Sequence, residues 1–179
     1  MTAPLDPYHA VVQAFVDSDI RYIVVGMSGI NYYAKGSADS FGTMDYDMLI
    51  EPTIPNVEKA MHCLDRLGFT LGTADGPFEP AQLRNIVRER RTLIATTPEG
   101  ATVELLLRIS GYSFSELAGD AVTVTVQGIP VKVGRLQKLL TSKRLADRPK
   151  DRLFLRRYAS LLQEQPKKPA ERKRRRLAP

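Results

Sequence analysis

Residues 41–52 read FGTMDYDMLIEP and place Asp45 and Asp47 two positions apart in a strand-forming run. Side chains two apart on a strand point to the same face, so the two carboxylates should converge while Tyr46 and Met48 turn toward the core. Paired hard oxygen ligands suit Mg²⁺. Two acids on the solvent-exposed face of an ordinary edge strand would show the same spacing. The run alone therefore does not decide between a metal site and an exposed strand face.

The segment before this run predicts a strand, a glycine turn and a helix. Residues 21–25 (RYIVV) are rich in β-branched side chains, Gly26 allows a tight turn, and Ser28 lies near the start of the helix that follows. Backbone N–H groups and a hydroxyl at such a turn can hold a phosphate. A turn glycine followed by a helix-capping serine is the simpler alternative.

A third acid lies in a later apolar run. Residues 102–109 read TVELLLRI, a predicted strand interrupted by Glu104. A carboxylate in such a run either faces solvent or joins a site. Three acids from two strands could support an in-line displacement at phosphorus with two metal ions.

The remaining patterns predict one domain over residues 1–165 in which strands and helices alternate. The expected helices cover residues 7–18, 30–34, 57–67, 113–118, 136–146 and 149–163. The expected strands cover residues 21–25, 44–50, 69–73, 85–97, 101–109, 122–126 and 129–133, with turns at 98–100 and 127–128.

The positive charge of the chain is concentrated at its C-terminal end. Seven of the 26 basic residues and one of the 20 acidic residues fall in 166–179, which leaves 19 of each in 1–165. The tail PKKPAERKRRRLAP cannot bury apolar surface, so we expect it to be disordered until it meets an anion. RNA is one possible partner, and a solvated tail that only improves solubility is the alternative.

Several classes of site are disfavoured by composition. Cys63 is the single cysteine, which excludes an internal disulfide and a cysteine-cluster metal site. His9 and His62 are the only histidines and lack metal-ligand spacing, which disfavours both a zinc site and histidine-based catalysis. With neither a membrane-spanning run nor a secretory leader in the sequence, we expect a cytoplasmic protein without membrane partners.

Four runs together resemble the polymerase-beta-type nucleotidyltransferase superfamily. They are YIVVGMSGINYY (22–33), FGTMDYDMLIEP (41–52), TVELLL (102–107) and VKVGRLQKLLTSKRLADRPKDRLFLRRY (131–158). The similarity spans about residues 21–162 and is closest to small bacterial members related to abortive-infection toxins of toxin–antitoxin systems. Its most specific parts are the Thr43-x-Asp45-x-Asp47 strand and Lys143 followed by ADRPKD.

The resemblance implies the α/β (α+β) nucleotidyltransferase fold: a mixed, mostly antiparallel sheet with flanking helices, closed by two C-terminal helices. It implies Mg²⁺-dependent transfer of a nucleoside monophosphate from a triphosphate such as ATP to a hydroxyl of RNA, a protein or a small molecule, with an antitoxin as a further partner. The residues it assigns are Asp45, Asp47 and Glu104 to catalysis and metal binding, and Gly26, Ser28, Thr43 and Lys143 to the nucleotide.

Some residues favour a different reading of the same fold. Met27 stands where the family has a small residue after the turn glycine, Glu104 is one methylene longer than the usual Asp, and Phe41 replaces a common arginine. A catalytically inactive module that binds nucleotide, RNA or a partner protein is therefore the alternative. Arg148 and Asp151 are expected to form a local ion pair with a structural role.

Overall fold

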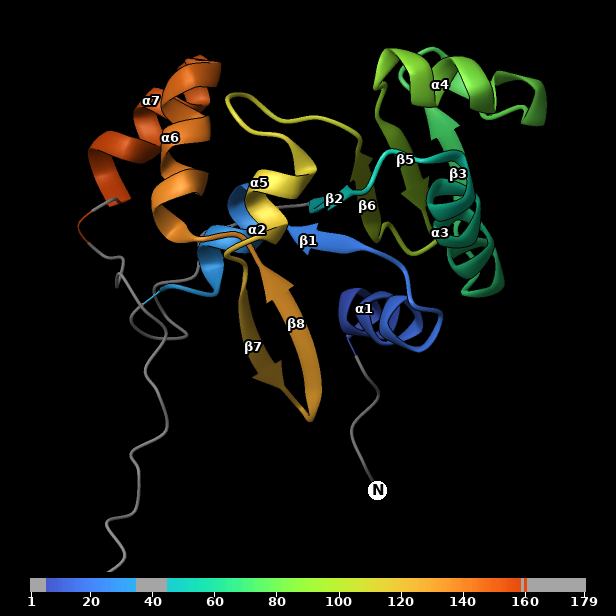
Figure 1. The fold of residues 1–179 in the computed structure, drawn as a ribbon, viewed down its shortest axis with the longest axis horizontal. Helices are drawn as coiled ribbons and strands as arrows, with labels where there is room; N and C mark the ends of the chain where they lie inside the picture. The colour runs from blue at the N-terminus through green and yellow to red at the C-terminus, as the bar shows by residue number, and fades with distance from the viewer. Residues whose placement is uncertain (1–5, 35–44, 159, 161–179) are drawn as a thin grey trace, which may run out of the picture.

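In the described part of the chain, the strands form an eight-stranded sheet, and helices pack against it (Figure 1). The computed structural model describes residues 6–34, 45–158 and 160. The strands are β1 (Tyr22–Val24), β2 (Asp45–Ile50), β3 (Thr70–Thr73), β4 (Gly76–Pro77), β5 (Leu93–Thr96), β6 (Thr102–Leu106), β7 (Val122–Val126) and β8 (Ile129–Val133). The helices are α1 (Pro7–Asp17), α2 (Gly26–Asn31), α3 (Ile54–Arg66), α4 (Leu83–Glu89), α5 (Phe114–Ala118), α6 (Leu136–Ala146) and α7 (Pro149–Tyr158).

The strands lie in the order β4-β3-β5-β6-β2-β1-β8-β7. The pairs β2–β6 and β1–β8 are parallel, and the remaining neighbours are antiparallel. The expected mixed, mostly antiparallel sheet is therefore confirmed. The strand that carries the two aspartates is not at an edge, because β2 lies between β1 and β6.

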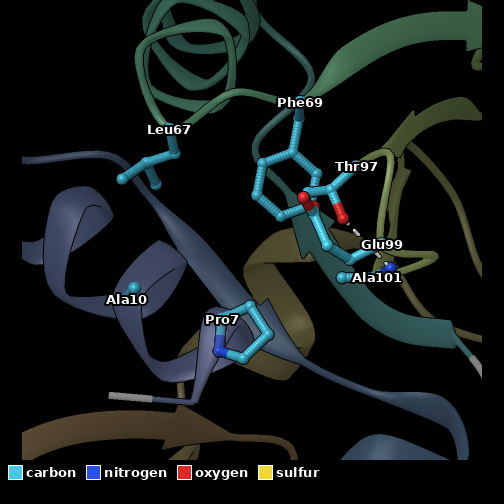
Figure 2. A pocket seen from close by; sticks show the side chains of 7 residues that line it. All are labelled: Pro7, Ala10, Leu67, Phe69, Thr97, Glu99 and Ala101. Carbon is cyan, nitrogen blue, oxygen red and sulfur yellow. Dashed lines mark hydrogen bonds between the residues drawn. The ribbon is translucent and has the colours of Figure 1, made fainter. Parts of the chain in front are cut away.

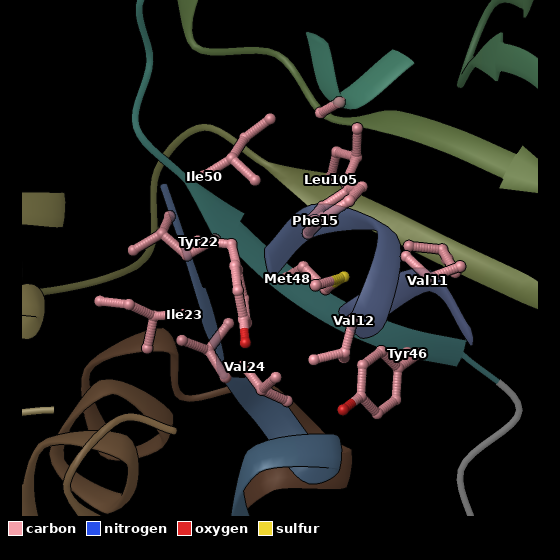
Figure 3. Close-up of a cluster of buried hydrophobic side chains, with 14 of the residues drawn as sticks. Val11, Val12, Phe15, Tyr22, Ile23, Val24, Tyr46, Met48, Ile50 and Leu105 are labelled. Atoms are coloured by element: carbon pink, nitrogen blue, oxygen red, sulfur yellow. The ribbon is translucent and has the colours of Figure 1, made fainter. Parts of the chain in front are cut away.

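Helix α1 covers one face of β2. The Asp6 side chain accepts a hydrogen bond from the Tyr8 N–H at 2.8 Å, and Pro7 follows at the first helical position, as the sequence predicts. The Tyr8 ring stacks on Tyr46 with centroids 5.1 Å apart. Figure 3 shows the apolar side chains that meet here, among them Val11, Val12 and Phe15 of α1 with Met48 of β2, all of which are buried.

The strand expected over residues 85–97 is wrong in its first half. Leu83, Ile86 and Val87 are spaced three and four residues apart, and they form the buried side of α4. Arg90 then ends the helix in the left-handed conformation, with φ of 56°. Only Leu93–Thr96 pairs as a strand. Apolar residues alone did not separate a short helix from a strand at this position.

The C-terminal half agrees more closely with the expectation. Gln127 and Gly128, with φ of 50° and 81°, form the two-residue turn between β7 and β8. Helices α6 and α7 begin at the expected residues and lie side by side at one end of the molecule (Figure 1). Thr43 and the basic tail over 166–179 lie outside the described residues. No helix in the described part is long and apolar enough to cross a membrane.

Candidate active site

Three carboxylates lie on one face of two neighbouring strands. Asp45 and Asp47 alternate along β2 with the buried side chains of Tyr46 and Met48, so the acids face away from α1. In the parallel pairing of β2 with β6, Glu104 is the register partner of Asp47. The structure thus brings together the three acids that the sequence singled out, although they come from distant parts of the chain.

The three acids of the cluster act on one another electrostatically. Burial first, and then the charges of Glu104 and Asp45, raise the pKa of Asp47 to about 7. Burial also raises the pKa of Glu104, with Asp45 contributing to the rise. Crowded, partly desolvated carboxylates repel one another, so the cluster favours a proton or a cation.

Gly26 brings the backbone of the turn against Asp47. Its φ is +60°, and a Cβ at this position would lie 2.1 Å from the Asp47 Oδ2 atom. The Val25 N–H donates to the Asp47 carbonyl oxygen at 3.0 Å. Glycine is therefore needed here both for the backbone conformation and for the space that the carboxylate occupies.

The Ser28 hydroxyl joins α2 to the strand of the aspartates. Its Oγ donates to the Asp45 carbonyl oxygen at 3.0 Å and accepts from the Asp47 N–H at 3.1 Å. Ser28 is 3% exposed. In this structure the hydroxyl holds the backbone of β2 in place, a role that sequence reasoning did not anticipate.

A buried ion pair lies on the acid side of the sheet. Lys143 of α6 is 8% exposed, and its Nζ lies 2.9 Å from Oδ1 of Asp151, which is 1% exposed. The Arg148 Nε lies 2.6 Å from the Asp151 Oδ2 atom. Burial opposes the charge of Asp151, but the hydrogen bonds from Arg148 and Lys143 prevail and lower the pKa of that carboxyl. The expected Arg148–Asp151 pair is present, with its acid buried rather than exposed.

These cations also act on the carboxylate cluster. The positive charges of Lys143 and Lys150 oppose the rise in the pKa of Asp47, and those of Lys150 and Arg148 oppose the rise at Glu104. The start of α7 is therefore within electrostatic range of the acids. Sequence reasoning did not single out Lys150, although its place in the ADRPKD run was a usable signal.

A chain of hydroxyl groups lies on the opposite side of β2. The Tyr46 and Tyr32 hydroxyls are 2.6 Å apart, and the Tyr32 hydroxyl lies 3.1 Å from the His9 Nε2 atom. Burial raises the pKa of Tyr46 and of Tyr32, so both remain neutral. The chain connects α1, the end of α2 and β2 behind the acids.

A cavity of about 380 Å³ lies on this same α1 side. Its lining includes Pro7 and Ala10 of α1, Phe69 before β3 and Thr97 at the turn after β5 (Figure 2). None of the predicted site residues that the structure describes lines it. The cavity is therefore separate from the carboxylate cluster, which faces the other side of the sheet.

The side chains of the cluster fit a magnesium ion in their chemistry. Within the described residues, no three Asp, Glu, His or Cys side chains are already arranged to hold a metal. Mg²⁺ commonly uses one or two carboxylates together with water and substrate phosphates, and so does not require a closed protein cage. Burial, and after it the charges of Glu104 and Asp45, disfavour the ionised form of Asp47, and a bound cation would offset both effects.

The fold is that of a nucleotidyltransferase. Among solved structures, the chain is similar to the lincomycin-bound lincosamide antibiotic adenylyltransferase LnuA, with a TM-score of 0.58 over 90% of this chain and 99% of the other. The two sequences are 11% identical, so the likeness concerns the fold. No protein-family profile matches the sequence, and no curated protein matches it.

Proposed function

We propose that this protein is a Mg²⁺-dependent nucleotidyltransferase that transfers a nucleoside monophosphate from a triphosphate to a hydroxyl group. The observation that carries the proposal is the register of Asp47 and Glu104 on adjacent parallel strands, with Asp45 on the same face and the Gly26 turn against Asp47. The nucleotidyltransferase fold of the chain supports it.

The proposed reaction is an in-line displacement. The acceptor oxygen bonds to the α-phosphorus, the bond to pyrophosphate breaks, and pyrophosphate leaves. Asp45 and Asp47, with Glu104 as a third ligand, would hold Mg²⁺, which when bound neutralises the triphosphate and makes the acceptor hydroxyl easier to deprotonate. The Glu104 carboxylate, whose pKa is raised, would accept the proton of that hydroxyl on a free Oε atom.

The cations beside the acids would serve the triphosphate. Lys143 and Lys150 already act electrostatically on Asp47. Phosphates bound to a metal ion at Asp47 would therefore lie within range of the same two positive charges. Asp151 holds Lys143 by a 2.9 Å contact and limits how far its ammonium group can move. We assign Lys143 to the nucleotide. The turn at Gly26 and Ser28 would bound the phosphates on the other side, together with Thr43.

We propose RNA as the first acceptor to test. The seven basic residues in 166–179 supply a sequence-independent attraction for a polyanion. A protein hydroxyl and a small molecule are the other acceptor classes, and the lincomycin-bound neighbour makes antibiotics a natural arm of the small-molecule test. Measuring acceptor binding at low and high salt distinguishes RNA from the other two acceptor classes, since only RNA binding should depend strongly on salt.

Label transfer tests the activity. The protein is incubated with each α-³²P-labelled nucleoside triphosphate, Mg²⁺, and total RNA, cell lysate or antibiotics. We expect a labelled acceptor with the wild type and none with the Asp45→Ala/Asp47→Ala double variant. Asp65→Asn, which removes one negative charge on the exposed side of α3, should keep full transfer. Transfer that survives the double substitution would refute the assignment.

Deletion after Gln165 should weaken RNA binding at low salt if the tail contributes.

An inactive module of the same fold is the second candidate. It is favoured by the absence, among the described residues, of three side chains already arranged around a metal. Such a module would bind a magnesium–nucleotide complex without releasing pyrophosphate, so calorimetric binding without turnover against every acceptor would support it. A toxin held inactive by an antitoxin is a form of the first candidate, and a neighbouring gene for a small partner that abolishes transfer on binding would identify it.

A further inference from the structure

The two edges of the sheet differ in how they are protected against pairing with another chain. One edge is β4, which consists of the two residues Gly76–Pro77. A short edge and a proline are standard protections. The other edge is β7, whose five residues, Val122–Val126, read VTVTV. This strand carries neither charge nor proline, and all its side chains are β-branched, so it is well suited to further pairing.

The outward hydrogen-bonding groups of β7 can be assigned from its neighbour. The Pro130 carbonyl oxygen accepts from the Tyr22 hydroxyl at 3.3 Å, and the Lys132 N–H donates to the same hydroxyl at 3.2 Å. Since Tyr22 lies on β1, these two residues of β8 direct their backbone groups away from β7. Their register partners on β7 are Thr125 and Thr123.

In an antiparallel pair, two opposite residues either both direct their backbone N–H and C=O groups at each other or both direct them away from each other. Thr123 and Thr125 therefore turn their N–H and C=O groups to the free side of β7, while Val122, Val124 and Val126 direct theirs to β8. Among the strands that the structure describes, β8 is the one neighbour of β7. In Figure 1 the β7–β8 hairpin projects from the rest of the sheet, which leaves this side accessible.

We propose that β7 pairs antiparallel with β7 of a second copy of this chain, about a two-fold axis at Val124. The sequence VTVTV is a palindrome around this residue. The axis sets Thr123 against Thr125 of the second copy, where each pair exchanges both N–H···O bonds. A slip by one residue would set valine against threonine and would match outward groups with inward ones.

The side chains fit this register on both faces. Val122, Val124 and Val126 are half-buried on the core side, and the two-fold axis would place the valines of the two copies in one continuous row. Thr123 and Thr125 are exposed on the other side and would form cross-strand threonine pairs. Because β4 is blunted at the opposite edge, pairing closes at a dimer.

The interface is small, and this sets the affinity. A five-residue strand pair falls below the ~1,200–2,000 Å² that stable complexes bury, so we expect a dissociation constant of about 100 μM. The proposal is independent of nucleotide transfer, because no residue of the carboxylate cluster lies on β7.

Sedimentation velocity on the full chain from about 5 to 500 μM, the range for interfaces of this size, tests the proposal. The wild type should pass from monomer to dimer across the range. Thr123→Lys/Thr125→Lys places like charges opposite each other across the axis and should weaken the dimer at least roughly tenfold. Thr123→Lys/Thr125→Glu places opposite charges there, so its dimer should be as tight as the wild type, and tighter at low salt.

The second double variant controls for damage to the hairpin, since both variants place lysine at the same exposed position. Circular dichroism and thermal unfolding show whether each variant is folded. A wild type that stays monomeric over the whole range would overturn the proposal. Equal behaviour of the two folded double variants, whether both dissociate or neither does, would also overturn it, because the register would then be wrong.

Discussion

Replacing Asp47 with asparagine should stabilise the metal-free protein at neutral and higher pH while abolishing nucleotide transfer. The change keeps the shape of the side chain and removes its charge. Folding raises the pKa of this carboxyl from 3.8 to about 7, first through burial and then through the charges of Glu104 and Asp45. The wild type therefore loses stability where Asp47 has to ionise in the folded state.

The magnitude follows from linkage between protonation and folding. An acid with a raised folded-state pKa is held more tightly as its protonated form, so stability falls as pH rises from about 4 through about 7 and is level above that. A difference of this size corresponds to at most about 4 kcal/mol, since each tenfold change in proton affinity is worth about 1.4 kcal/mol. Because Asp47 retains some contact with solvent, we expect the asparagine variant to gain about 2–4 kcal/mol at pH 8.

Urea unfolding in EDTA at intervals between pH 4 and 8 measures this effect. The wild-type free energy of unfolding should decline with pH and the Asp47→Asn value should decline much less, so that the two curves diverge. Asp65→Asn, which removes a negative charge on the surface of α3, should follow the wild type. Parallel curves for Asp47→Asn and the wild type, or a variant that is less stable at pH 8, would refute the reasoning.

Two further substitutions address the turn and the ion pair. Gly26→Ala places a Cβ against the Asp47 carboxylate and should lower transfer at least roughly tenfold, whereas Gly68→Ala, also at positive φ but with open space around it, should cost only about 1 kcal/mol in urea unfolding and keep full activity. Lys143→Met should destabilise by about 3 kcal/mol in urea unfolding, because it breaks the buried pair with Asp151, and adding Asp151→Leu should recover most of that loss.

The sequence was most informative where the spacing of apolar side chains along a strand determines which of them face the core. Alternation along β2 predicted which side chains face the core, and Tyr46 and Met48 are buried as expected. The strand before Gly26 was also predicted, because a short β-branched run followed by glycine has few other conformations. The helix after it was expected over residues 30–34, but it begins at Gly26 and ends at Asn31. The expected site roles of Asp45 and Asp47 remain predictions that transfer assays can test.

Long-range packing decided the rest. Glu104 could be singled out as an acid in an apolar run, but its register opposite Asp47 depends on a pairing between distant strands that no local pattern encodes. The burial of Asp151 was missed for the same reason, since a charged residue at the start of a helix is usually exposed until a neighbouring helix covers it. The short helix at Leu83–Glu89 was mistaken for a strand because few apolar residues define its period.

The two hydrogen bonds of the Ser28 hydroxyl have a consequence for how such a site can change during evolution. They hold the segment that follows Gly26 against the strand that carries the two aspartates, so these two segments keep a fixed position relative to each other. Ser28→Ala would remove both hydrogen bonds without changing a carboxylate. The cations that act on Asp47, Lys143 of α6 and Lys150 of α7, lie outside this pair of hydrogen bonds. Under the proposed function, a change of acceptor would call for substitutions around α6 and α7 and would leave these two hydrogen bonds in place.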